Sequence, residues 1–131
     1  MNIYQNVLAC VTKQKTCERL IKAASGRKSA TGSLHVLHVA KNSWNILDNS
    51  RESEALEYLF KISKLHDAEM TMLRADNISE TIAAFALEHH IDLIVLGQSS
   101  DEQESKFYRQ LRTLLKDKAI DIEVIPSDDN R

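Results

Sequence analysis

The sequence predicts an α/β fold, namely a single three-layer α/β/α domain built on a five-stranded parallel sheet with the strand order 3-2-1-4-5. Three observations support this prediction. Short apolar runs alternate with longer segments of helical periodicity, which is the pattern of successive β-α units. The connections are short, so consecutive strands should run parallel, with helices on both faces of the sheet. The strand candidates also differ in how completely apolar they are, and this difference orders them across the sheet.

The first strand is expected over the continuous apolar run Val7–Val11, and the second over Leu34–Val39. Between them, Thr16 is expected to cap a helix that continues to about Ser29, with Gly32 as its stop signal. The residues expected on the inner face of this helix are Leu20, Ile21 and Ala24.

A second helix is expected over Ser53–His66, followed by a short third strand over Met70–Leu73. Asn77 and Glu80 are expected to form the N-cap and N3 pair of a third helix. The apolar residues expected to be buried are Leu56, Leu59, Phe60 and Ile62 in the second helix and Ile82, Phe85, Ala86 and Leu87 in the third.

The fourth strand is expected over Leu93–Leu96, ending at Gly97. A helix over roughly Phe107–Lys116 and a last strand over Ile120–Ile125 complete the alternating pattern. Pro126 should end that strand, because proline has no N–H to donate to a strand ladder.

The apolar character of the strands predicts their order. Strands one and four are apolar on both faces, as central parallel strands must be. The last strand alternates apolar residues with Asp121 and Glu123, which is typical of a half-exposed edge strand. The third is short and contains Thr71, so it suits the other edge. This order has its topological switch point between strands one and four, where ligands bind at the carboxyl ends of the strands.

Three segments are expected at that edge of the sheet: Thr12–Lys15 after strand one, Val39–Lys41 at the end of strand two, and Gly97–Ser100 after strand four. The candidate ligand-binding residues are Thr12, Lys13, Gln14, His38, Val39, Gly97, Gln98 and Ser99.

Composition limits the classes of function. The 131 residues suit one domain, and a formal net charge of −2 argues against binding to nucleic acid or a membrane surface. The start of the chain does not resemble a signal peptide, and the longest apolar runs are far below the roughly 20 residues that cross a bilayer. A cytoplasmic location is therefore expected. Cys10 and Cys17 are expected to be reduced thiols.

The sequence offers no catalytic or metal-binding set. His35 and His38 are three residues apart on a strand, so they should point to opposite faces and cannot share a zinc ion. Ser99 and Ser100 follow a strand, but no G-x-S-x-G motif surrounds them. Asp101 and Glu102 are expected to lie in a mobile, solvated loop rather than to form a positioned acid–base pair. We therefore expect a non-enzymatic protein without a required cofactor.

The segments "VLACVTKQKTCERLIKAA", "GSLHVLHVA", "ISETIAAFALEHHIDLIVLGQSS" and "IDIEVIP" resemble the universal stress protein family. The pattern is most similar to the Usp domain of the potassium-responsive sensor histidine kinase KdpD. The resemblance covers residues 6–126 and implies one Usp domain over residues 1–131, with the same sheet order. That sheet is of the adenine nucleotide alpha hydrolase-like, flavodoxin-like winding. It further implies a regulatory role in stress signalling, and the KdpD likeness implies potassium or osmotic signalling.

ATP-binding members of this family place an aspartate after strand one, where this chain has Thr12, and continue the glycine of strand four into a G-x-x-G loop. Gly97 matches the first of those glycines, and no later residue matches the second. The following residues include Asp101, Glu102 and Glu104, and carboxylates repel a triphosphate. ATP in the usual family pose is therefore not expected.

Two other readings stay open. The first is that the protein binds a ligand of the AMP or cyclic di-AMP type, because some KdpD Usp domains bind cyclic di-AMP. Positive charge on one side of the cleft would then come from Lys13, Lys15 and Lys41. The other is a protein-interaction module with an empty cleft and a signalling-protein partner. Family members often form homodimers through the last strand, although Asp121 and Glu123 would then approach their own copies.

Overall fold

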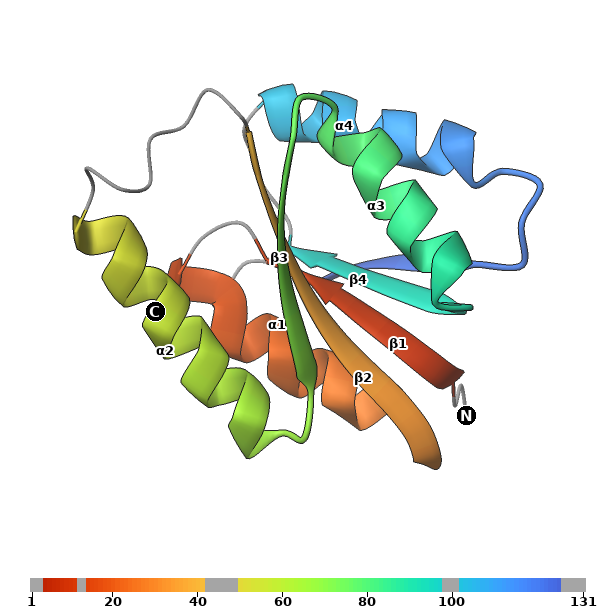
Figure 1. Ribbon diagram of the computed structural model, residues 1–131. Helices are drawn as coiled ribbons and strands as arrows, with labels where there is room; N and C mark the ends of the chain where they lie inside the picture. Colours follow the sequence, from red (N-terminus) through yellow and green to blue (C-terminus); the bar gives the residue numbers. More distant parts are fainter. Residues whose placement is uncertain (1–3, 12–13, 42–49, 98–101, 126–131) are drawn as a thin grey trace.

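The computed structural model describes residues 4–11, 14–41, 50–97 and 102–125 (Figure 1). Within these ranges, five strands alternate with four helices. The strands are β1 (Tyr4–Cys10), β2 (Lys28–Lys41), β3 (Glu69–Ala75), β4 (Leu93–Gly97) and β5 (Asp121–Ile125), and the helices are α1 (Gln14–Arg27), α2 (Ser50–Leu65), α3 (Ile78–Glu88) and α4 (Glu102–Leu114). Within the described ranges, no helix is both long and apolar enough to span a membrane.

The strands form one parallel sheet in the order β3-β2-β1-β4-β5, which confirms the predicted fold class. Helices α1 and α2 cover one face of the sheet, and α3 and α4 cover the other (Figure 1). The strands expected to be central, β1 and β4, are central, and those expected at the edges, β3 and β5, are at the edges.

The hydrophobic core has two halves, one on each face of the sheet. In β1, Val7 and Ala9 point toward α1 and α2, whereas Leu8 and Cys10 point toward α3 and α4. All four side chains are buried, as expected for a central parallel strand with helices on both sides. Burial raises the pKa of the Cys10 thiol, so this side chain acts as a small core residue rather than a nucleophile.

The boundary between α1 and β2 differs from the prediction. The helix begins at Gln14, so Thr16 lies in its first turn rather than at its cap, because Gln14 and the residue after it are good helix formers. It ends at Arg27, and Gly32 is not its stop signal but an interior residue of β2. A side chain at Gly32 would overlap the backbone carbonyl of Gln5 in β1, so the glycine permits a close approach of two strands.

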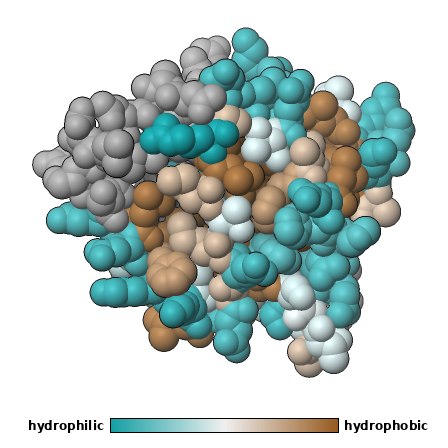
Figure 2. Space-filling model, viewed as in Figure 1, coloured by the Kyte–Doolittle hydropathy of each residue, from teal (hydrophilic) through white to brown (hydrophobic). Residues whose placement is uncertain are grey.

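Two residues expected in the core are exposed. Phe60 is 49% exposed on α2, where the ammonium of Lys64 lies 5.0 Å from its ring centroid, and Leu87 is 45% exposed on α3. Both lie beside the buried stripe of their helix rather than on it. On the side of the molecule that carries β3, Figure 2 shows apolar side chains interspersed with polar ones.

The start of α3 is as predicted. Asn77 is the N-cap, and its side-chain Oδ1 accepts a hydrogen bond of 3.0 Å from the backbone N–H of Glu80. The cap satisfies one of the N–H groups that have no partner within the helix.

Candidate functional site

Strands β1 and β4 lie side by side, and their register brings their carboxyl ends together. Ala9 of β1 is opposite Val95 of β4. Val11 and Gly97 each follow this last recorded pair by two residues in the sequence. The expected switch point between these two strands is therefore at this edge of the sheet.

The end of β2 is joined to the same place by two hydrogen bonds. The N–H of Val11 donates to the carbonyl of Leu37 at 3.0 Å, which extends the β1–β2 pairing beyond Cys10. The Nδ1 atom of His38 lies 3.0 Å from the carbonyl oxygen of Val11. A carbonyl only accepts, so Nδ1 must carry the proton. This bond holds the buried imidazole at the carboxyl edge, on the face covered by α1 and α2.

Gly97 has a packing role at this edge. A Cβ atom built on Gly97 would lie 3.3 Å from Cδ1 of Leu20, closer than an ordinary van der Waals contact. The missing side chain therefore lets α1 pack closely over the end of β4. The sequence pattern suggested a phosphate-binding glycine here, and close packing is a second reason for the same residue type.

His38 and Gly97 are on the same face of the sheet, the one that α1 covers, but on strands β2 and β4, which have β1 between them. Val39 is buried on the opposite face, in the core half formed with α3 and α4. Gln14 is the first residue of α1. The candidate residues that lie outside the described part are Thr12, Lys13, Gln98 and Ser99, together with the side chain of Gln14.

The acidic segment after β4 is partly helical, which corrects the expected boundary of the last helix. Helix α4 begins at Glu102, five residues before Phe107, so Glu102 and Glu104 belong to its first turn. Asp101 lies outside the described residues.

The histidines of β2 point to opposite faces, as predicted. His35 faces α3, where its ring centroid is 5.2 Å from that of His89 and 6.0 Å from that of Phe85. His38 points toward the face that α1 and α2 cover. In residues 4–11, 14–41, 50–97 and 102–125, no three His, Cys, Asp or Glu side chains are grouped so that they could hold a metal ion.

Burial lowers the pKa of His35, and the nearby imidazole of His89 lowers it further, against an opposing effect of Glu69. The Nδ1 atom of His35 is buried and has no hydrogen-bond partner within the described chain. A proton on this ring would therefore be poorly solvated.

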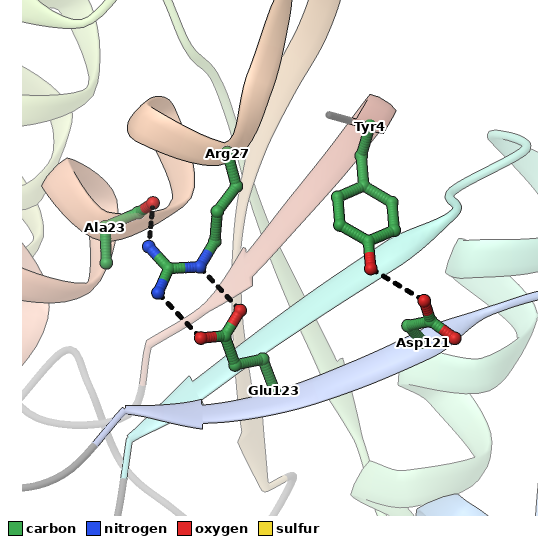
Figure 3. Close-up of polar contacts among 5 residues, drawn as sticks. All are labelled: Tyr4, Ala23, Arg27, Asp121 and Glu123. Atoms are coloured by element: carbon green, nitrogen blue, oxygen red, sulfur yellow. Dashed lines mark hydrogen bonds and ion pairs between the residues drawn. The ribbon is translucent and has the colours of Figure 1, made fainter. Parts of the chain in front are cut away.

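Two polar contacts on β5 were missed by sequence reasoning (Figure 3). The hydroxyl of Tyr4 donates to Oδ2 of Asp121 at 2.7 Å, and Arg27 donates from Nε and Nη2 to the two carboxylate oxygens of Glu123 at 2.5 and 2.6 Å. The sequence predicted only that these carboxylates lie on a half-exposed edge strand. The local sequence does not indicate which residues contact them, because Tyr4 and Arg27 are 117 and 96 residues away in the sequence.

No protein-family model matches the sequence, and no curated protein matches it. Solved structures do match. The hypothetical protein MJ0577, whose biochemical function was assigned from its structure, has a TM-score of 0.72 at 16% identity over 97% of this chain and 99% of that chain. A universal stress protein in complex with cAMP has a TM-score of 0.63 at 13% identity over 95% and 98%. A universal stress protein family protein from Arabidopsis thaliana with AMP bound has a TM-score of 0.59 at 12% identity over 97% and 94%.

The fold is that of the universal stress proteins. At identities of 12–18% among the structures compared, the likeness is one of architecture. The universal stress protein fold has its switch point between β1 and β4, where this chain has Val11, His38 and Gly97.

Proposed function

We propose that residues 1–131 form a non-catalytic, cytoplasmic regulatory domain of the universal stress type that binds an adenine-containing nucleotide. The ligand is of the AMP or cyclic di-AMP type and lies at the carboxyl ends of β1 and β4. The observation that carries this proposal is the pairing of those strands up to Ala9 and Val95, which sets their carboxyl ends side by side, with the buried imidazole of His38 hydrogen-bonded to the carbonyl of Val11. Thr12, Lys13, Gln14, Gln98 and Ser99 would complete the site.

The proposal excludes ATP in the usual family pose. A phosphate loop needs several backbone N–H groups free of side chains, and after Gly97 the chain has no further glycine. In the sequence, Asp101, Glu102 and Glu104 follow Gly97 where a phosphate loop would have glycines, and the formal charge of these residues disfavours a triphosphate. A nucleotide with fewer charges fits better, and the neighbours solved with AMP and cAMP support a ligand of that size.

A role in potassium or osmotic signalling, with a signalling protein as the partner, is the finer part of the proposal. It rests on the resemblance of the sequence to KdpD Usp domains. A pull-down from cells grown at low and high potassium, with the protein as bait, tests this part separately from ligand binding.

Thermal unfolding with AMP, cAMP, cyclic di-AMP and ATP tests the ligand. A nucleotide present at about 100 times its Kd should add about 2.7 kcal/mol to the free energy of unfolding. His38→Leu should lower the affinity for that nucleotide, while His90→Asn, an exposed change at the other end of the sheet, should not. If no nucleotide raises the Tm of well-folded wild-type protein, the binding proposal fails and an interaction module without a ligand is favoured.

A specific observation favours a second function, homodimerisation through β5, as in an adaptor. β5 is an edge strand. The N–H of Asp121 donates to the carbonyl of Asp92, which marks Asp121 as facing β4. Since N–H and C=O groups alternate in direction along a strand, those of Ile122 and Val124 point away from the sheet. Among the strands that the structure describes, none pairs with this side of β5, so these groups can pair with a second copy.

Symmetry and this alternation together select one register. A two-fold antiparallel pairing that uses the whole of β5 must centre on Glu123, which sets Ile122 opposite Val124 of the second copy as a hydrogen-bonded pair. Glu123 then faces its own copy at close range, where like charges repel. The bidentate contact with Arg27 compensates that charge within each copy.

Sedimentation velocity at micromolar concentration tests the dimer. Val124→Pro removes an outward N–H and should give monomers, while Val124→Thr keeps the N–H and the strand preference and should stay dimeric. A wild-type protein that sediments only as a monomer would exclude this function.

A further inference from the structure

A groove lies at the amino end of β5, whereas the candidate nucleotide site is at the carboxyl edge of the sheet. The groove has a volume of about 560 Å³ and is bordered by the C-terminal part of α4 and the turn that follows it. Its charged lining consists of Arg112, Lys116, Lys118, Asp121 and Glu123.

One of the two acidic groups of this groove is paired inside the fold, because Glu123 forms an ion pair with Arg27. Asp121 accepts a hydrogen bond from the hydroxyl of Tyr4, which is uncharged, so its negative charge remains. In the part of the chain that the structure describes, three cations therefore line the groove against one carboxylate without a cationic partner.

The basic groups are less occupied. Among the described residues, Arg112 donates a hydrogen bond of 3.3 Å to the hydroxyl of Tyr108, which carries no formal charge. Lys116 and Lys118 are exposed, and within the described residues neither forms an ion pair. The groove therefore presents uncompensated positive charge next to a free strand edge, which suits an extended acidic segment.

The chain itself contains such a segment directly after β5. Pro126 and Ser127 are followed by Asp128 and Asp129. Within one molecule these residues follow the carboxyl end of β5, and the groove lies at its amino end, about 16 Å away for a five-residue strand. A symmetric antiparallel pair removes this separation, because the carboxyl end of one β5 then adjoins the amino end of the other.

We propose that Asp128 and Asp129 of a second copy bind in the groove beside Lys116 and Lys118. This inference rests on the proposed β5 dimer and names the contacts that select its partner. In the register centred on Glu123, Ile125 of one copy is opposite Asp121 of the other, so the chain after Pro126 continues past that strand end toward Lys118. Two-fold symmetry forms the contact twice.

Charge reversal tests the pairing, with the dimer dissociation constant measured by sedimentation across a range of salt concentrations. Lys116→Glu/Lys118→Glu and Asp128→Lys/Asp129→Lys should each weaken the dimer about tenfold or more, because each puts like charges together twice. The variant that combines all four changes should return to within about threefold of wild type, since the ion pairs are restored in reversed sense. Lys61→Glu/Lys64→Glu on α2 makes the same change in charge elsewhere and should leave the dissociation constant unchanged.

The possible results distinguish failure of the acidic contact from failure of the β5 dimer. A dimer that resists both reversals, or one that the combined variant fails to restore, overturns the acidic contact and leaves β5 pairing in place. A monomeric wild type overturns both. Neutralising Asp128 and Asp129 to asparagine should also flatten the dependence of the dissociation constant on salt, and an unchanged slope would contradict the proposed contact.

Discussion

Arg27 and Glu123 are 96 residues apart in the sequence and are joined by two parallel hydrogen bonds, from Nε to Oε1 at 2.5 Å and from Nη2 to Oε2 at 2.6 Å. Arg27 is the last residue of α1, and Glu123 is the middle residue of the edge strand β5 (Figure 3). The remaining terminal nitrogen of Arg27, Nη1, donates to the carbonyl of Ala23 at 2.8 Å, which fixes the orientation of the guanidinium. The hydrogen bonds from Arg27 hold the pKa of Glu123 below its ordinary value, so the carboxylate is ionised at neutral pH.

Arg27→Gln should weaken the proposed dimer roughly fivefold, because each Glu123 would then face its copy without a compensating cation. The double variant Arg27→Gln/Glu123→Gln removes both charges and should recover most of the affinity. Dissociation constants from sedimentation check both values. Equal affinities for wild type and Arg27→Gln would show that this ion pair has no part in association.

Stability should fall as the solution is acidified from about pH 7 to about pH 5, partly through His35. The pKa of His35 in the folded chain lies below its ordinary value of 6.5 because of burial first and the charge of His89 second, with Glu69 acting in the opposite sense. The unfolded chain therefore binds a proton more readily than the folded chain. The stabilising contribution is complete above pH 6.5 and is lost as the pH falls toward the folded pKa.

Urea unfolding of His35→Phe across this pH range measures that contribution. Phenylalanine keeps an aromatic ring next to Phe85 and removes the titrating group, so the acid-induced loss of stability should be smaller than in wild type. His90→Asn, at an exposed position with a positive φ of 56° that asparagine tolerates, is the matched control and should behave like wild type. A pH dependence identical in all three proteins would rule His35 out as its source.

The same substitution should have opposite effects at two glycines. Gly97→Ala should destabilise the fold by about 1 kcal/mol, because the new methyl group would press on Leu20. Gly26→Ala should stabilise it by roughly 0.5 kcal/mol, since Gly26 lies near the end of α1 with nothing within 4 Å of an added Cβ. Equilibrium denaturation of the two variants side by side gives both signs, and a neutral Gly97→Ala would show that the packing at this edge is loose.

Asn77→Ala should cost about 1 kcal/mol of stability, because the backbone N–H of Glu80 loses its acceptor at the start of α3. Asn77→Asp keeps an acceptor at the same place and should stay close to wild type. Thermal unfolding of both variants tests the cap. If alanine and aspartate have equal effects, the cap contributes nothing measurable.

The sequence predicted at which edge of the sheet the candidate residues lie, but not which side chains and backbone groups they contact. The switch point followed from the strand order, and His38 and Gly97 do lie at the same edge of the sheet. Sequence patterns did not reveal that the imidazole is tied to the carbonyl of Val11, or that Leu20 gives Gly97 a packing role. Both are contacts between elements, and neither residue type indicates which partner will be within reach.

The sequence alone determined the number, direction and order of the strands and the cap of α3, because apolar periodicity and capping are local properties that each segment carries by itself. It did not determine where α1 gives way to β2, since the early residues of β2 are held by pairing with β1. Only the tertiary structure decided that Phe60 and Leu87 lie on the exposed side of their helices. It also decided that Asp121 is hydrogen-bonded by a tyrosine hydroxyl and that Glu123 is paired with an arginine. Those outcomes depend on groups distant in the chain that meet only after the sheet has formed.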